Sequence, residues 1–277
     1  MTECQELVEE LKREREKDDF FVMLSHDLKN PMTAVIGAID IVREGRLGPV
    51  NSEQVDYLQS AIDSCNEVVT MIDNLLDIRR FEAGKINLTL HDINPAEIAR
   101  KVAHTFSRAA EYDGITLTTS IIDPPFCISA DRTALSRILG NLLSNSLKFT
   151  PEGGTIDVSC SCITDVDVHD LMIPPYVGLP DHMAQRRCFV KICVRDSGDG
   201  IPETQQQRVF DRYTQSKIAE GRERGGAGLG LAYCKYAVEN FKGMIWVESA
   251  IDRGSEFIML FPCVAEPSGS CPSNQQG

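Results

Sequence analysis

Apolar residues recur along the first 84 positions at the spacing of amphipathic helices. From Val55 onward they are separated by three and four residues in alternation, which is the heptad seam of packed helices. This seam comprises Val55, Leu58, Ile62, Cys65, Val69, Ile72 and Leu76. A nearly identical seam precedes the loop at 43–52, at Phe21, Leu24, Leu28, Met32, Val35, Ile39 and Val42. Two such helices joined by a short loop predict an antiparallel hairpin. One hairpin buries only part of its seam, so we expect a homodimer in which two chains form a four-helix bundle.

The pattern changes at about residue 90, where short strand-like runs alternate with helical ones. Asn94 followed by Pro95 predicts the start of a helix that ends near Gly114. Further helices are predicted at Arg132–Phe149 and Leu229–Phe241. Strands are predicted at Ile115–Ile121, Phe126–Ala130, Thr155–Cys162, Cys188–Arg195, Gly243–Ser249 and Ser255–Phe261. This irregular alternation predicts a mixed sheet with helices on one face.

Three segments lie outside this pattern. Residues 1–19 are highly charged and predict a helical signalling linker; a solvated extension and the end of a signalling coiled coil both remain open. Residues 163–187 lie between two predicted strands, contain prolines and show no period, so we interpret them as an inserted surface loop. A passive loop is favoured, and a docking surface is the alternative. The tail 266–277 is rich in Pro, Ser, Gly and Gln, and we expect it to be flexible.

Composition narrows the function classes. The 277 residues carry a formal net charge of -13, which argues against binding nucleic acid through its phosphate backbone. No apolar run is long enough for a transmembrane helix, and the N-terminus has no apolar signal region, so a cytoplasmic location is expected. The ten cysteines contain no CxxC and no paired Cys/His spacing. We therefore expect buried or free thiols and no structural zinc site.

His26 lies on a helix face away from the apolar seam, where a core residue would not be expected. A step of two residues turns a helix by about 200°, so His26 points away from the seam formed by its helical neighbours. Asp27 is adjacent and could orient the imidazole or accept its proton, and Asn30 lies four residues on, on the same face. Pro31 lacks the N–H that would bond the carbonyl of Asp27, so it loosens the helix there. A neutral imidazole at this position is a usable nucleophile.

Polar residues later in the chain have the chemistry of a phosphate and metal site. Asn141 and Asn145 share a helix face that also carries Lys148. Amide oxygens ligate magnesium or its waters, and a lysine neutralises phosphate. Cys160 and Cys162 share one face of a strand, which allows redox control but favours two small core residues.

Two glycine-rich segments follow. In VRDSGDGI, Asp196 ends a strand, and Gly198 and Gly200 allow the backbone to turn close to a ligand before Ile201. In GGAGLGLAYCK, glycines lead into a helix that begins near Leu229, where backbone N–H groups and the helix dipole favour phosphate. The glycines of this second segment include Gly226, Gly228 and Gly230.

These segments occur in a recognisable order. SHDLKNPMTAVIG, DRTALSRILGNLLSNSLKFTPEGG, VRDSGDGI, RVFDRYTQ and GGAGLGLAYCK resemble the H-box, N-box, first glycine box, F-box and second glycine box of the sensor histidine kinases of two-component systems. The resemblance covers about residues 20–262. It implies a fold of the α plus α/β class, in which an antiparallel helical hairpin forming a dimeric four-helix bundle is followed by a GHKL (Bergerat-type) α/β sandwich. The hairpin (20–86) would be the dimerisation and histidine phosphotransfer domain, and 90–265 the ATP-binding catalytic domain.

The resemblance also implies an activity. ATP with Mg2+ would phosphorylate His26, and the phosphoryl group would pass to an aspartate on a response-regulator receiver domain. Asp27 matches the base or orienting group, and Asn30 matches a position that often supports dephosphorylation of the regulator. A separate or truncated sensor module would supply the signal.

The same resemblance assigns contacts to the nucleotide. Asn145 and Asn141 would lie near the metal, Lys148 and the loop 226–230 near the phosphates, and Asp196 against the adenine amino group. Gly198, Gly200, Ile201, Gly226, Gly228, Leu229 and Gly230 complete the implied cofactor-binding set. The polar span Pro202–Arg224 resembles an ATP lid.

Three alternatives remain to be weighed. A phosphatase-dominant homologue would carry the same motifs. A hydrolytic GHKL ATPase typically has a glutamate where this chain has Asn141, and an amide cannot act as that base. A catalytically silent scaffold is disfavoured because every motif residue is in place.

Overall fold

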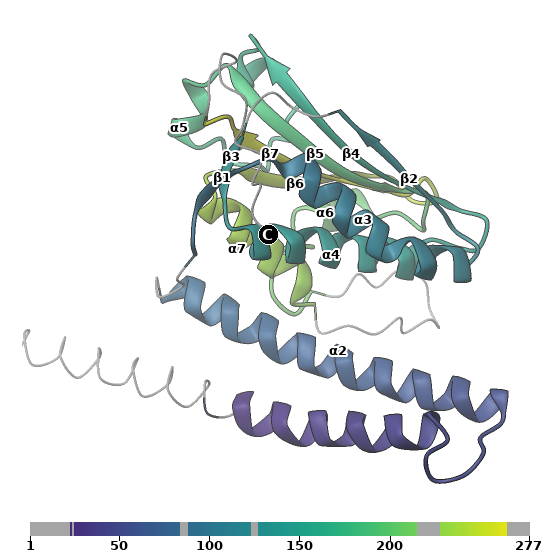
Figure 1. Ribbon diagram of the computed structural model, residues 1–277. Helices are drawn as coiled ribbons and strands as arrows, with labels where there is room; N and C mark the ends of the chain where they lie inside the picture. The colour runs from purple at the N-terminus through teal and green to yellow at the C-terminus, as the bar shows by residue number, and fades with distance from the viewer. Residues whose placement is uncertain (1–22, 24, 84–87, 123–126, 215–227, 265–277) are drawn as a thin grey trace, which may run out of the picture. The chain divides into compact units, whose positions relative to one another are not determined.

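The computed structural model describes residues 23, 25–83, 88–122, 127–214 and 228–264 (Figure 1). The chain divides into two compact units, Met1–Ile86 and Asn87–Gly277. The predicted linker 1–19 and the tail 266–277 lie outside the described residues.

The first unit is the antiparallel hairpin that the heptad spacing predicts. A helix over 25–43 is followed by a turn and by α2 (Ser52–Glu82). Asn51 begins α2: its side-chain oxygen accepts a hydrogen bond from the Gln54 backbone N–H at 2.8 Å, and the Gln54 side chain accepts one from the Asn51 N–H at 2.9 Å. This reciprocal capping box satisfies two N–H groups that the helix would otherwise leave unpaired.

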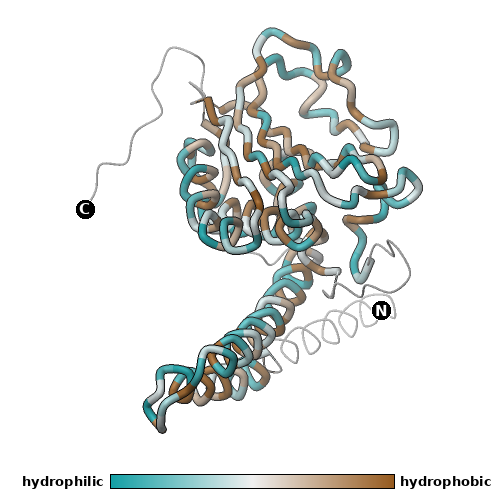
Figure 2. The backbone as a smooth tube through the Cα atoms, turned by 90° about the vertical axis from the view of Figure 1, so that its right-hand side faces the viewer, coloured by the Kyte–Doolittle hydropathy of each residue, from teal (hydrophilic) through white to brown (hydrophobic). Residues whose placement is uncertain are grey.

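Part of the predicted seam is exposed on a single hairpin. Leu28 is 50% exposed and Val35 is 45% exposed, whereas Ile62 is 6% exposed. Figure 2 shows apolar positions recurring along both helices. Lys29 forms an ion pair with Asp73 across the hairpin, which helps to fix the pairing of the two helices. The exposed apolar stripe agrees with the expectation that one hairpin covers only part of its seam.

The second unit is an α/β sandwich built on a mixed five-stranded sheet. The strand order is β2-β4-β5-β7-β6, with β2 parallel to β4 and the other pairs antiparallel. Their bounds are Thr116–Ile121 (β2), Thr155–Thr164 (β4), Cys188–Asp196 (β5), Met244–Ser249 (β6) and Ser255–Pro262 (β7). A separate ribbon pairs β1 (His91–Ile93) with β3 (Ile128–Ala130). β1 was not predicted, because three residues are too few to show a period.

Three helices form a layer on one face of this sheet (Figure 1). They are α3 (Pro95–Tyr112), α4 (Arg132–Phe149) and α7 (Gly230–Asn240). Asn94 and Asp131 cap α3 and α4 through their side chains, as their residue types favour. Alternate residues of β5 are fully buried, as the strand period requires for one apolar face: they are Val190, Ile192 and Val194.

The opposite face of the sheet is covered at one end by the segment 163–187. Phe189 and Cys193 alternate with the residues just named, so they point to the other face. There they pack in one cluster with Val168 and Met183, both of which are fully buried. The segment is the mostly irregular surface insertion that was predicted, but Val168 and Met183 anchor it to the sheet, which its sequence shows by no periodic pattern.

This segment contains two short helical elements and contacts the edge strand of the sheet. They are η1 (Val168–Asp170) and α5 (Asp181–Ala184). The Tyr176 hydroxyl donates to the Val247 carbonyl at 2.9 Å, on the edge strand β6. Capping an edge carbonyl in this way reduces the opportunity for another strand to pair there.

Candidate functional site

Helix α4 connects the two glycine-rich segments. The Asn141 side-chain nitrogen donates to the Gly230 carbonyl at 3.3 Å, at the first residue of α7. At the C-terminal end of α4, the Phe149 carbonyl accepts from the Asp199 N–H at 3.3 Å. Segments that are about 50 to 90 positions from α4 in sequence therefore meet on one helix.

Asp196 is a buried carboxylate that the backbone holds in place. Its Oδ1 accepts from the Gly198 N–H at 3.0 Å and from the Ser255 N–H at 3.1 Å. Its Oδ2 accepts from the Ser146 hydroxyl at 3.4 Å. Burial raises the pKa of Asp196, while these hydrogen bonds oppose the rise. Oδ2 retains acceptor capacity for an N–H donor of a ligand.

The glycines of the first glycine box are required by backbone packing. A Cβ on Gly198 would lie 2.5 Å from the Phe149 carbonyl oxygen, and one on Gly200 would lie 2.0 Å from the Ala250 carbonyl oxygen. Gly200 also has φ +73°, which glycine adopts most readily. These positions hold the turn tightly between α4 and the β6–β7 connection, which gives a structural reason for both glycines.

The first turn of α7 has no side-chain cap, in contrast to α2, α3 and α4. Its leading N–H groups lack the side-chain oxygens that usually satisfy them. Leu229 precedes the helix and is 4% exposed. The Gly228 carbonyl accepts from the Tyr213 N–H at 3.1 Å. An uncapped helix start after glycines suits an anionic group. Gly226 lies outside the described residues.

The remaining predicted cofactor residues lie on these same elements. Asn145 and Lys148 are half-buried on α4. The Ile201 side chain is buried, and its N–H donates to the Ser249 hydroxyl at 2.7 Å. The structure therefore groups Asn141, Asp196 and Gly230 through α4, and it places Ile201 on the turn that follows Asp196.

The F-box residue Phe210 packs in the core. Its ring contacts Phe257 edge-on, with centroids 6.3 Å apart. Gln206, in α6 (Glu203–Gln206), donates to the Ile201 and Ser249 carbonyls. The predicted lid at Pro202–Arg224 is therefore packed over its first part, and its remainder from 215 lies outside the described residues.

His26 is exposed on the first hairpin helix. Its side chain is 74% accessible, and Nδ1 lies 3.6 Å from a carboxylate oxygen of Asp27. The Asn30 side-chain nitrogen lies 3.2 Å from Nδ1 and 3.4 Å from Nε2. The amide can therefore orient the imidazole ring. The helix continues through Pro31.

Three cysteines that no sequence pattern connects lie together. The sulfurs of Cys162, Cys188 and Cys263 are all within 4.8 Å of one another. Burial, together with the neighbouring Cys188 thiol, raises the pKa of Cys162 to about 11. Seven of the described cysteines carry free thiols, as predicted. The prediction is wrong for Cys127, which is disulfide-bonded.

Comparison with known proteins identifies the class. Residues 130–265 match the family described as histidine kinase-, DNA gyrase B- and HSP90-like ATPase, and residues 16–84 match the His Kinase A (phospho-acceptor) domain. The helical hairpin and the α/β sandwich thus correspond to a phosphoacceptor domain and an ATP-binding domain. The chain belongs to the histidine kinase family of two-component signalling.

Individual relatives agree with this assignment. The alginate biosynthesis sensor protein KinB of Pseudomonas aeruginosa is 30% identical over 90% of this chain and 37% of its own. The circadian input-output histidine kinase CikA of Synechococcus elongatus is 31% identical over 93% of this chain and 32% of its own. The crystal structure of full-length ShkA with AMPPNP has a TM-score of 0.63 at 25% identity, covering 90% of this chain and 47% of that one. The chain spans about a third of the length of the two curated relatives.

None of the described helices combines the length and the hydropathy that crossing a bilayer requires.

Proposed function

We propose that this chain uses ATP to phosphorylate its own His26 and then passes the phosphoryl group to an aspartate on a receiver domain. The observation that supports this most strongly is the combination of two features in one chain. One is an exposed imidazole with the Asn30 amide and the Asp27 carboxylate beside it. The other is the convergence of Asp196, Asn141 and the uncapped start of α7. Neither feature alone requires a kinase.

The residues around α4 fit a magnesium nucleotide. Asp196 offers Oδ2 to the adenine amino group, because Oδ1 already accepts from two backbone N–H groups. The phosphates would meet Lys148 and the first turn of α7. Asn141 uses its amide nitrogen for Gly230, which leaves its oxygen to face a metal or a metal-bound water, as Asn145 would also do. Magnesium, when bound, would neutralise part of the phosphate charge.

The phosphoacceptor chemistry is assigned to three neighbouring residues. A neutral imidazole attacks phosphorus through an unprotonated ring nitrogen, and the proton on the other ring nitrogen must be stabilised or removed. An Asp27 carboxylate oxygen lies 3.6 Å from Nδ1 of His26, so the carboxylate can stabilise positive charge that develops on the ring. Asn30 orients the ring through its amide.

A labelling assay tests this proposal. Incubation with γ-labelled ATP and magnesium should give acid-labile, alkali-stable label on the protein. His26→Ala should abolish the label, whereas His104→Ala should retain it, because His104 is an exposed histidine on another helix, α3. Label that persists in His26→Ala would contradict the proposal. Stoichiometric phosphate release without labelled protein would instead indicate a hydrolytic ATPase.

The contact between Asn30 and His26 also favours a second activity, removal of phosphate from the regulator. An amide beside the phosphoacceptor can position a water for that hydrolysis. Asn30→Ala should then slow dephosphorylation of a phosphorylated receiver domain more than it slows labelling of His26. Equal losses in both assays would limit Asn30 to orienting the histidine.

The exposed seam supports a homodimer. A second hairpin would cover Leu28 and Val35, which a single chain leaves about half exposed. Light scattering at micromolar concentration should give twice the chain mass, and Val35→Lys should shift the mass toward that of a monomer. A wild-type monomer under these conditions would contradict the dimer. The input signal would come from a separate or covalently linked sensor module.

A further inference from the structure

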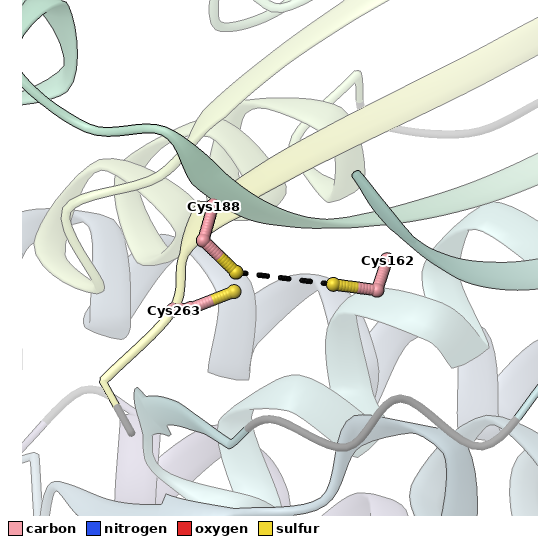
Figure 3. A group of neighbouring side chains, drawn as sticks. All are labelled: Cys162, Cys188 and Cys263. Carbon is pink, nitrogen blue, oxygen red and sulfur yellow. Dashed lines mark hydrogen bonds between the residues drawn. The ribbon is translucent and has the colours of Figure 1, made fainter. Parts of the chain in front are cut away.

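Two thiols on strands and one directly after a strand converge at one end of the sheet. Figure 3 shows the sulfurs of Cys162, Cys188 and Cys263 directed toward one another. The sulfurs of Cys162 and Cys188 are 3.9 Å apart, and all three cysteines are free. Their positions are 26 and 75 residues apart in sequence, so spacing alone gives no indication of the cluster.

Strand pairing fixes this arrangement. Cys162 lies near the end of β4, Cys188 begins β5, and Cys263 follows β7. β5 pairs with both other strands, and the Cys263 N–H donates to the Cys188 carbonyl at 3.1 Å. Each cysteine lies two positions along the chain from a buried residue on the helix-covered face: Cys160, Val190 and Phe261 respectively. By the strand period, all three thiols therefore point to that face.

The spacing of the sulfurs suits a metal ion that prefers sulfur. Zinc binds cysteine sulfur at about 2.3 Å with tetrahedral angles, which separates neighbouring sulfurs by about 3.8 Å. The Cys162 and Cys188 sulfurs are 3.9 Å apart, and all three sulfurs lie within 4.8 Å of one another. Harder ions such as magnesium prefer oxygen ligands, so the nucleotide metal does not compete for thiolates.

We propose that Cys162, Cys188 and Cys263 bind one thiophilic metal ion of the Zn2+ type. Each thiol gives its proton to solvent and ligates as a thiolate, so Zn2+ and three thiolates leave a net charge of -1. A water molecule supplies the fourth ligand. Cys162 and Cys188 are half-buried, which gives both the ion and that water access from solvent.

Oxidation to a disulfide is the competing chemistry. A disulfide requires two sulfurs to approach to about 2.05 Å, so Cys162 and Cys188, now 3.9 Å apart, would have to move considerably. It would also use only two of the three thiols. A metal ion uses all three sulfurs, which already lie within 4.8 Å of one another, and the geometry therefore favours metal binding.

The site would stabilise the base of the folded insertion. Cys162 directly precedes the segment 163–187 and Cys188 directly follows it. Cys263 belongs to the stretch that leaves β7. One ion would thus link both ends of the segment to the C-terminal side of the sheet, and metal binding would raise the thermal stability of the folded chain.

Cobalt titration of the full chain tests the proposal. The reduced protein, freed of metal by a chelator and kept with excess Mg2+, should bind one Co2+ and develop the thiolate-to-cobalt charge-transfer absorption. Zn2+ should displace the cobalt and raise the melting temperature. Cys162→Ala and Cys188→Ala should each weaken Co2+ binding by more than the roughly tenfold that loss of an outer-shell partner costs. Both residues are half-buried, so these variants should fold, which circular dichroism would verify.

Cys65→Ala is the matched control, because Cys65 is a half-buried free thiol in the hairpin. It should bind Co2+ as the wild type does. The proposal is wrong if the wild type shows no charge-transfer absorption, or if that absorption survives unchanged in both cluster variants. If mild oxidant caused a loss of two hydrogens confined to the cluster, and no metal were bound, the proposal would be wrong and the cluster would instead form a disulfide.

Discussion

The Asn141 side-chain amide donates to the carbonyl oxygen of Gly230 across 89 positions of sequence, at 3.3 Å. This hydrogen bond joins the polar face of α4 to the first residue of α7. Because an amide has one donor end and one acceptor end, satisfying Gly230 determines which way Asn141 points. One bond therefore orients an implied metal ligand and also positions the helix start to which the phosphates are assigned.

The first prediction follows from that orientation. Asn141→Asp replaces the donor with a carboxylate that repels both the Gly230 carbonyl and the phosphates of ATP. We expect ATP affinity to fall by at least about tenfold, which corresponds to roughly 1.4 kcal/mol. Isothermal titration calorimetry with ATP and magnesium measures this change. Asn240→Asp, which alters an exposed asparagine at the far end of α7, should leave the affinity unchanged. Equal affinity in both variants would remove Asn141 from the site.

A second prediction concerns Asp196 and pH. Because burial raises its pKa above the ordinary value of 3.8, the carboxylate becomes protonated at a higher pH than an exposed aspartate. ATP affinity should therefore decline with acidification before exposed carboxylates titrate. A raised folded-state pKa also means that this group favours folding at low pH, and that the contribution is lost as the pH rises through the folded-state pKa.

Asp196→Asn separates binding from folding. The amide oxygen can still accept from the Gly198 and Ser255 N–H groups, so the unfolding free energy at neutral pH should change by less than about 1 kcal/mol. The new amide donor would oppose the adenine amino group, and affinity should fall by about 10- to 100-fold, with the acid dependence removed. Urea unfolding and calorimetry at several pH values measure both effects. An unchanged affinity would mean that the adenine contact lies elsewhere.

The sequence predicts most regular elements here because their burial is periodic. α4 begins and ends at the predicted Arg132 and Phe149, since Asp131 caps it and its buried leucines repeat at helical spacing. The packing of the segment 163–187 cannot be predicted in this way, because its anchors Val168 and Met183 are single buried residues with no period. The spacing of apolar residues within a segment cannot predict a contact with strands that are distant in sequence.

In the candidate site too, sequence predicts what lies on one element but not what distant elements bring together. Asn141 and Asn145 share a face because they lie on one helix, which spacing alone predicts. Gly200 is restricted by the Ala250 carbonyl, 50 positions away, and sequence gives no distance between them. Sequence gives no indication of the cysteine cluster, because zinc motifs are recognised by closely spaced ligands, whereas here the strand order of the sheet brings the three cysteines together.

The folded insertion leads to a third prediction, with a matched pair of methionines. Met183 is fully buried and Met172 is 89% exposed within the same segment. Met183→Ala should lower the unfolding free energy by about 2–5 kcal/mol, because it leaves a cavity against the sheet. Met172→Ala should change it by less than about 0.5 kcal/mol. Urea denaturation followed by circular dichroism compares them. Similar small effects in both variants would show that the segment is a passive loop.

The last prediction contrasts two glycines that flank the same site. Gly200→Ala would place a Cβ 2.0 Å from the Ala250 carbonyl oxygen at φ +73°, so we expect a loss of at least about 2 kcal/mol in the unfolding free energy. Gly140 lies inside α4, and a Cβ there meets nothing within 4 Å. Gly140→Ala should therefore stabilise the chain by roughly 0.5–1 kcal/mol, as alanine does in helices. Thermal unfolding without nucleotide measures both changes. If Gly200→Ala kept full stability and lost only ATP binding, that glycine would be required for the ligand's approach and not for backbone packing.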